Sequence, residues 1–294
     1  MAVTEYRAEV ALEVRAELGE GPVWDEREQE LLFVDILGHR VHGFRPGNRA
    51  HRFFEVGRPV GAVVLREDGG LVLAAHDTFL LAESDGSHMV PLGEFRADGQ
   101  RVRFNDGKVD PSGRFLAGTM QWQESNAMGS LYMLAADGSV VTLLEEAEVS
   151  NGLAWSPDGT VLYYIDSARH TVDAFDVEPG TGRLSGRRVV ARVQGGDPDG
   201  MAIDDEGLLW VAVWEGSRVD RINPADGRQV AVVPMPTRNV SSVAFGGPLR
   251  DELFVTTARS GLDNNALAAE PHAGDLFIVR PGVTGPVSHR FKTS

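Results

Sequence analysis

The sequence predicts an all-β fold, a six-bladed β-propeller with about four antiparallel strands per blade. One unit recurs six times: a polar or small residue, an apolar strand, a turn rich in Gly, Pro and Asp, and a second apolar strand. Each unit continues with one or two further short alternating runs. A period of about 40 to 50 residues with four strands per unit is typical of a propeller. The units begin at Glu20, Gly61, Asn105, Asn151, Asp199 and Ser241, which are 41, 44, 46, 48 and 42 residues apart.

The strands of each unit can be read in order along the chain. They are short, rich in β-branched residues and bounded by turn residues, and few segments have helical periodicity. In the fourth unit, "NGLAW" and "TVLYYID" flank the turn "SPDG", and "TVDAFDV" and "RRVVARV" follow. The paired inner strands of the six units are EGPVWDEREQELLFVDI, GAVVLREDGGLVLAAH, NDGKVDPSGRFLAGTM, NGLAWSPDGTVLYYID, DGMAIDDEGLLWVAVW and SSVAFGGPLRDELFVTTA.

One strand-like segment is left over at the N-terminus and provides a way to close the ring. "AEVALEVRA" precedes the first unit and has no partner within it. Pairing with the last unit, whose strands include "GDLFIV", would cover an exposed sheet edge. We find no linker and no shift in composition, so residues 1–294 are expected to form a single propeller domain.

The overall composition excludes several classes of protein. The formal net charge of −15 disfavours binding to nucleic acid, whose phosphates are also negative. Cysteine is absent, so disulfides, thiolate nucleophiles and Cys-based zinc sites are excluded. The charged N-terminus has no apolar core of a signal peptide, and no apolar run is long enough to cross a membrane. We expect a cytoplasmic protein without a membrane partner, whose oligomeric state the sequence does not indicate.

The residues that open the six units should form a ring at one end of the central channel. Inner strands line the channel and run the same way, so the residues four positions before each strand's last apolar residue lie at one level. The ring contains two carboxylates, two carboxamides, a serine and a glycine, at Glu20, Asp199, Asn105, Asn151, Ser241 and Gly61. Converging oxygen atoms suit Ca²⁺, Mg²⁺ or Mn²⁺, and zinc is not excluded. The alternative is that Asn-Gly, Asp-Gly and Glu-Gly serve only as turns.

Several longer motifs resemble those of the senescence-marker-protein/regucalcin/gluconolactonase family. They are "GEGPVWDE", "RFNDGKVDPSGRFLAGTM", "SNGLAWSPDG" and "DPDGMAIDDEGLLWVAVW", and the resemblance extends from about Leu18 to Val279. It implies a six-bladed propeller with one divalent metal ion at the mouth of the channel and hydrolysis of sugar lactones. The implied metal ligands are Glu20, Asn151 and Asp199, and the implied substrate-binding residues are Arg103 and Asn105.

The segment after "GTM" departs from the family pattern. Some members carry a substrate-binding Glu two residues after this motif, where this chain has Trp122. Glu124 is a candidate to reach the same space. Trp122 is a candidate to stack on a sugar ring or to narrow the pocket. We therefore count both as expected substrate contacts and place substrate preference in this loop.

The residues leave the mechanism and the reaction class open. In one mechanism, Asp199 is the general base that activates the attacking water. In the alternative mechanism, a metal-bound hydroxide attacks and Asp199 orients it. The leading reading is a metal-dependent lactonase acting on a small sugar-derived lactone. The alternatives are another metal-dependent esterase or organophosphate hydrolase on the same scaffold, and a calcium-binding propeller without turnover. Lys108, on an inner strand, is either a channel residue or purely structural.

Overall fold

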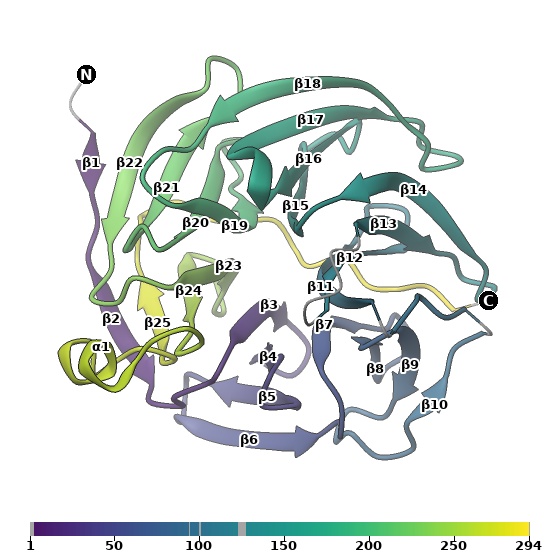
Figure 1. Ribbon diagram of the computed structural model, residues 1–294, viewed down its shortest axis with the longest axis horizontal. Coiled ribbons are helices and arrows are strands. Elements are labelled where there is room, and N and C mark those ends of the chain that lie inside the picture. The colour runs from purple at the N-terminus through teal and green to yellow at the C-terminus, as the bar shows by residue number, and fades with distance from the viewer. Residues whose placement is uncertain (1–2, 94, 100, 123–127, 294) are drawn as a thin grey trace.

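The computed structural model of the chain contains six antiparallel sheets arranged around a central axis (Figure 1). The structure describes residues 3–93, 95–99, 101–122 and 128–293. In blades 1 to 4 the inner strand comes first in the chain and the following strands pair outward in order, and blades 5 and 6 each gain an N-terminal strand at the outer edge. This arrangement confirms the predicted all-β fold with six blades and about four strands per blade. No helix among the described residues is long and apolar enough to cross a membrane.

The first three blades follow one another directly. Blade 1 contains β3 (Gly19–Asp25), β4 (Glu30–Asp35), β5 (Arg40–Arg45) and β6 (Ala50–Glu55). Blade 2 contains β7 (Val60–Leu65), β8 (Leu71–Ala75), β9 (Thr78–Ala82) and β10 (Val90–Pro91). Blade 3 contains β11 (Val102–Val109), β12 (Phe115–Gln121), β13 (Gly129–Leu134) and β14 (Val140–Ala147).

The last three blades also contain the two short helices of the chain's described part. Blade 4 contains β15 (Ser150–Trp155), β16 (Val161–Asp166), β17 (Thr171–Val177) and β18 (Leu184–Arg192), with a short 3-10 helix η1 (Ser167–Arg169) after β16. Blade 5 contains β19 (Asp197–Ile203), β20 (Leu209–Trp214), β21 (Arg218–Asn223) and β22 (Arg228–Pro234). Blade 6 contains β23 (Val240–Gly246), β24 (Glu252–Thr257) and β25 (Leu276–Val279), with helix α1 (Asn264–Ala269) between the last two.

The N-terminal segment closes the ring, as the sequence predicted. Strand β2 (Ala8–Leu12) pairs antiparallel with β25 and completes blade 6, with Ala8 opposite Val279. A feature that the sequence did not predict precedes it. Strand β1 (Thr4–Glu5) adds in parallel to β22 as a fifth strand of blade 5. The N-terminal residues thus join two neighbouring blades and cover both outer edges.

The hairpin between the two inner strands of blade 4 shows why the repeated turn motif works. The backbone N–H of Gly159 donates to the Ser156 carbonyl oxygen at 2.8 Å, which closes the "SPDG" turn. Gly159 has a φ of 71°, a left-handed conformation that costs glycine little. The Asp158 carboxylate accepts from the Thr160 N–H at 3.1 Å. The turn residues therefore set the register of β15 against β16.

The hydrophobic core lies between blades rather than within one of them. The inner strands β7, β15 and β23 are buried at every residue. One core cluster joins Leu116 and Leu131 of blade 3 to Leu153 and Trp155 of blade 4. Neighbouring sheets therefore fix one another's position, and this mutual packing gives the ring a rigid inner wall.

A C-terminal strap, residues 281–293, crosses the molecule at the end opposite the first residues of the inner strands (Figure 1, yellow). It contacts the far ends of the inner hairpins in five blades. Its backbone pairs with Arg250 of blade 6, Asp205 of blade 5, Leu65 of blade 2 and Gly113 of blade 3, and its Ser288 N–H donates to Glu26 of blade 1. Arg290 pairs with Asp25 at 2.6 Å, and the Phe291 side chain is fully buried. The strap therefore links blades that do not touch one another.

We expect Phe291→Ala to destabilise the whole ring, because it removes a fully buried aromatic side chain from the core between blades 2 and 3. The free energy of unfolding should fall by about 3–5 kcal/mol. Chemical denaturation followed by tryptophan fluorescence measures this change. Leu249→Ala is the matched control, because Leu249 is 71% exposed and should change stability by less than about 0.5 kcal/mol. Equal effects of the two substitutions would contradict a structural role for the strap.

Candidate active site

The structure brings the predicted ring residues together at the mouth formed by the first residues of the inner strands. Glu20 on β3, Asn151 on β15 and Asp199 on β19 are buried, with exposed fractions of 3%, 4% and 7%. The carboxyl groups of Glu20 and Asp199 lie close enough for each to affect the pKa of the other. Residues of three blades that are distant in sequence therefore meet in one place.

The remaining ring positions have different surroundings. Asn105 of blade 3 donates to the Asn151 side-chain oxygen at 3.2 Å and belongs to the site. Ser241 of blade 6 instead donates to the Gly19 carbonyl oxygen at 2.5 Å and connects blade 6 to blade 1. Gly61 of blade 2 lies against the backbone of Phe104. The site is therefore asymmetric, although the repeat is regular.

Local irregularities of the inner strands direct the site residues toward the mouth. The pairing register shifts between Glu20 and Val23, between Ser150 and Leu153, and between Pro198 and Met201. Such bulges re-aim side chains at the ends of strands. Glycine is also required after Asn151, because a Cβ atom at Gly152 would lie 2.6 Å from the Asp199 carbonyl oxygen. The Asn-Gly pair is thus explained by close approach of β15 and β19.

A chain of hydrogen bonds fixes the orientation of the Asn151 amide. Arg103 Nη1 donates to Asn105 Oδ1 at 2.7 Å, and Asn105 Nδ2 donates to the Ser150 carbonyl oxygen at 3.0 Å as well as to Asn151 Oδ1. On the other side, Asn151 Nδ2 donates to Ser167 Oγ at 2.9 Å. With its nitrogen held by Ser167 and its oxygen accepting from Asn105, the amide has one fixed orientation.

Burial of several acids in one place shifts their pKa values. Burial, and next the neighbouring Asp106 carboxylate, raise the pKa of Glu20 to about 8. Burial and the charge of Glu20 raise the pKa of Asp199 well above its ordinary value. Burial lowers the pKa of Arg103 to about 10, although Glu20 and Asp199 oppose this shift. Without a further cation, the site therefore holds protons on carboxyl groups that would normally be ionised at neutral pH.

The residues at this mouth fit a divalent cation. Asp199 Oδ1 is buried and has no hydrogen-bond partner. A buried acceptor without a donor is costly, and a cation would satisfy it. Among the described residues no group of three His, Cys, Asp or Glu side chains is arranged to hold a metal, so the neutral oxygen of Asn151 is needed as the third ligand. Two carboxylates and one amide oxygen form a set that suits a hard cation.

Three of the predicted substrate-binding residues, Arg103, Asn105 and Trp122, lie in the described part of the chain, next to one another. Arg103 is 6% exposed, and its guanidinium carbon is 5.8 Å from the centre of the Trp122 ring. The His76 ring meets Trp122 edge-on, with ring centroids 5.7 Å apart, and His76 Nε2 lies 2.7 Å from the Gly99 carbonyl oxygen. Aromatic rings therefore line the approach to Arg103. Glu124 lies outside the described residues.

Sequence reasoning missed Ser167. This residue follows β16, opens η1 and is not part of the inner strand of the repeat. Its hydroxyl accepts from Asn151 Nδ2 and donates to the Pro198 carbonyl oxygen at 2.7 Å, directly before Asp199. Ser167 thereby connects two of the three candidate ligands. No signal in the sequence marks it, because the contact depends on how blades 4 and 5 pack.

Ser167→Ala should weaken metal binding by about tenfold, the range typical for losing a residue that orients a ligand. The substitution frees the Asn151 amide to rotate and present nitrogen instead of oxygen. Isothermal titration of the metal-free protein with Ca²⁺ or Mn²⁺ measures the affinity. Ser156→Ala is the control, since Ser156 lies in the exposed turn of the same hairpin. Unchanged affinity in Ser167→Ala would contradict this role.

The stability of the metal-free protein should fall as the pH rises toward 8. Because the pKa of Glu20 is raised from 4.5 to about 8, the folded protein retains a proton that the unfolded chain has released. Glu20 then lowers the free energy of unfolding between these two pH values by at most about 1.4 kcal/mol per pH unit, and Asp199, whose pKa is also raised, adds to the decrease. Denaturation in chelator at pH 6.5 to 8 measures the slope, and Glu20→Gln should make it smaller. A rising slope in the unmodified protein would refute the prediction.

Comparison with known proteins agrees with this architecture. The family model described as "SMP-30/Gluconolactonase/LRE-like region" matches residues 18–259. Regucalcin from Xenopus laevis is 42% identical to this chain over 291 residues, covering 96% of this chain and 97% of regucalcin. Human regucalcin is 38% identical over the same length, with the same coverage. The relatives are therefore similar over nearly their whole length.

The structure is also similar to solved structures. A luciferin-regenerating enzyme matches with a TM-score of 0.91 and 33% identity, covering 97% of this chain and 99% of the enzyme. A calcium-binding protein, regucalcin from Agrobacterium tumefaciens, matches with a TM-score of 0.93 and 27% identity, covering 99% and 100%. Sequence and structure agree, and the chain belongs to the SMP-30/gluconolactonase/LRE-like family.

Proposed function

We propose that the protein is a metal-dependent lactonase that hydrolyses a small sugar-derived lactone. The observation that carries the proposal is the unpartnered, buried Asp199 oxygen, which lies with Glu20 and Asn151 at one mouth of the propeller beside the buried Arg103. A ligand set made only to hold a structural ion has no need of an arginine and aromatic rings at its entrance. The family's gluconolactonase members support the reaction class.

The ion and the protein would have separate tasks in hydrolysis. A bound divalent cation would supply Lewis acidity that polarises the lactone carbonyl and makes water more acidic. Glu20, Asn151 and Asp199 would hold the cation. Asp199 would also accept the proton of the attacking water, through the carboxylate oxygen that does not hold the cation. A bound cation favours the ionised form of Asp199, which is the form that can accept a proton.

The remaining residues would bind the substrate. Arg103 carries a positive charge next to the ligand set and would stabilise negative charge that develops on the carbonyl oxygen. Asn105, fixed between Arg103 and Asn151, would orient a substrate hydroxyl or the water. Trp122 would offer its ring face to the C–H groups of a sugar ring.

The identity of the cation stays part of the proposal. The all-oxygen ligand set accepts Ca²⁺, Mg²⁺, Mn²⁺ or Zn²⁺. One related structure is named a calcium-binding protein, and this observation favours a second candidate function for the same site: calcium binding without turnover. Metal titration alone does not separate the two candidates, whereas turnover does.

Asp199→Asn and Asn151→Ala should each lower kcat/KM for aldonolactones at least about 100-fold, because each removes a group that holds the cation or moves the proton. Proton release from a lactone panel, with metal-stripped protein and single ions added back, measures the activity. Asp158→Asn, in the exposed turn of the same hairpin, should leave it unchanged. Full activity in both site variants would refute the assigned site. Turnover only of aryl esters or phosphotriesters would indicate another hydrolase, and no turnover would favour calcium binding.

A further inference from the structure

Two aromatic side chains and one arginine are in contact at the entrance to the site. The ring planes of His76 and Trp122 meet at 71° with centroids 5.7 Å apart, which is an edge-to-face contact. The Arg103 guanidinium carbon lies 5.8 Å from the centre of the Trp122 ring, within the range of a cation–π interaction. Trp122 therefore contacts both a histidine and the arginine that we assign to substrate binding.

His76 is fixed by three hydrogen bonds. It directly follows β8 and has a φ of 55°, a left-handed conformation that histidine adopts more often than most residues. Its backbone N–H donates to the Pro59 carbonyl oxygen at 2.7 Å, and its carbonyl oxygen accepts from the Phe104 N–H at 2.7 Å. Its Nε2 donates to the Gly99 carbonyl oxygen at 2.7 Å, and it must carry the ring hydrogen because a carbonyl oxygen only accepts. The imidazole therefore has one orientation, and its backbone is bonded to the residue that follows Arg103.

Trp122 and Arg103 both keep surface for a substrate. Trp122 directly follows β12, and its backbone N–H donates to the Arg101 carbonyl oxygen at 2.7 Å. Its side chain is only partly buried. Arg103 Nη1 donates to the Phe104 carbonyl oxygen at 2.9 Å and to Asn105 Oδ1 at 2.7 Å, whereas Nε and Nη2 have no acceptor in the described part of the chain. A substrate can therefore meet an aromatic ring and free N–H donors side by side.

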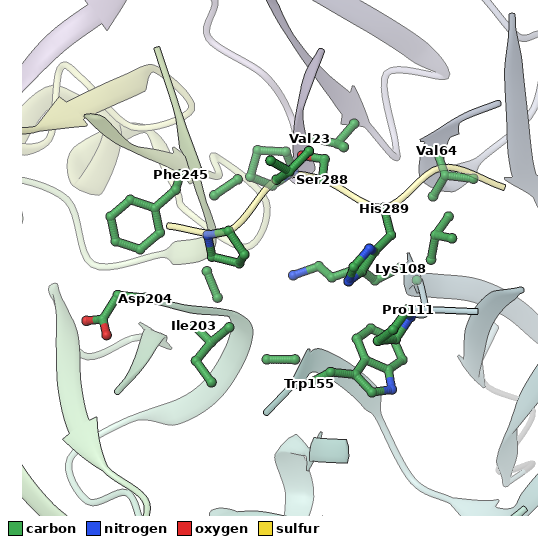
Figure 2. Close-up of a pocket in the computed structure, with 18 of the residues that line it drawn as sticks. Val23, Val64, Lys108, Pro111, Trp155, Ile203, Asp204, Phe245, Ser288 and His289 are labelled. Atoms are coloured by element: carbon green, nitrogen blue, oxygen red, sulfur yellow. The ribbon is translucent and has the colours of Figure 1, made fainter. Parts of the chain in front are cut away.

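The other end of the channel does not suit a sugar. Lys108 of β11 crosses the channel, since its Nζ donates to the Met201 carbonyl oxygen of β19 at 2.6 Å. Figure 2 shows Lys108 extending toward the middle of a cavity of about 310 Å³, which strap residues 286–289 also line. The cavity walls are mostly apolar and include Val64, Trp155, Ile203 and Phe245. A polar substrate is therefore expected to enter at the mouth, past Trp122.

We propose that His76 is a positioning residue that holds the Trp122 ring beside Arg103, and that Trp122 and Arg103 together select the ring form of a sugar ester over its open-chain form. A lactone ring has a face of C–H groups that can lie on the indole while an oxygen of the same ring accepts from Arg103. An open-chain ester has no such face. This inference rests on the proposed function and deepens it, because it names the residue that prepares ring recognition.

The position of the Trp122 ring can be measured without any activity. The chain has five tryptophans, so protein labelled with ¹⁵N-tryptophan should give one indole N–H signal for each, and Trp122→Phe identifies the signal of Trp122. His76→Asn removes the imidazole but keeps a residue that tolerates the left-handed conformation. It should shift the Trp122 signal and leave the others in place. His88→Asn is the matched control, because His88 has a φ of 53° in an exposed turn of the same blade and should shift none.

Kinetics with a matched pair of compounds test the selection of the ring. D-glucono-1,5-lactone is the ring form, and methyl D-gluconate is an open-chain ester of the same acid. His76→Asn should raise the KM for the lactone about three- to tenfold, the size of one aromatic contact, while kcat stays within about twofold. The inhibition constant of methyl gluconate should change by less than about twofold. Trp122→Ala should have the same effects, and adding His76→Asn to it should change KM by less than about twofold more.

Two kinds of outcome would overturn the proposal. An unshifted Trp122 signal in His76→Asn, or effects of the two substitutions on KM that multiply, would show that His76 does not act through Trp122. Equal weakening of lactone and methyl gluconate binding would show that the ring is not selected. Failure of the proposed function looks different, because no lactone is then turned over with any added metal. The indole signal still tests His76 in that case, and quenching of tryptophan fluorescence by the two compounds tests the selection.

Discussion

Three carboxyl groups buried at one mouth of a channel are the constraint on which this molecule depends. Glu20, Asp106 and Asp199 would repel one another if all were ionised, and their burial removes the water that would screen them. The surrounding residues reduce this repulsion. Arg103 approaches from the substrate side and Lys108 from the channel, while Asn151 supplies a neutral oxygen in place of another acid. A rigid ring is needed to hold such groups together against their repulsion.

The parts that the sequence predicted are those that repeat. Hydrophobic alternation and turn residues recur in every blade, so the fold, the strand count and the closing strand could be recognised from local patterns. The convergence of Glu20, Asn151 and Asp199 also followed from the repeat, because equivalent positions of a propeller lie on one ring. Family resemblance then selected these three from six ring positions. The geometry agrees with that selection, since Ser241 bonds to the neighbouring blade and Gly61 has no side chain.

The parts that escaped prediction depend on contacts that occur once. Ser167 contacts Asn151 because η1 directly follows β16 and places the Ser167 hydroxyl next to the Asn151 amide. Lys108 was assigned to an inner strand, but its bond to Met201 skips a blade, and no periodic pattern encodes such a contact. Strand β1 and the C-terminal strap likewise have no counterpart in the repeat. Functional asymmetry in a repeat protein thus arises from residues that break its symmetry.

The pairing of β2 with β25 also sets an order of assembly during synthesis. Strand β2 is synthesised before all six inner strands, whereas its partner β25, Leu276–Val279, is synthesised after them. Until then blade 6 is incomplete, β2 has no partner, and the ring cannot close. Contacts of such long sequence separation form slowly, and unpaired strands are prone to aggregate. The nascent chain therefore passes through a prolonged open form, in which the unpaired strand β2 and the incomplete blade 6 are the parts that molecular chaperones would have most reason to protect.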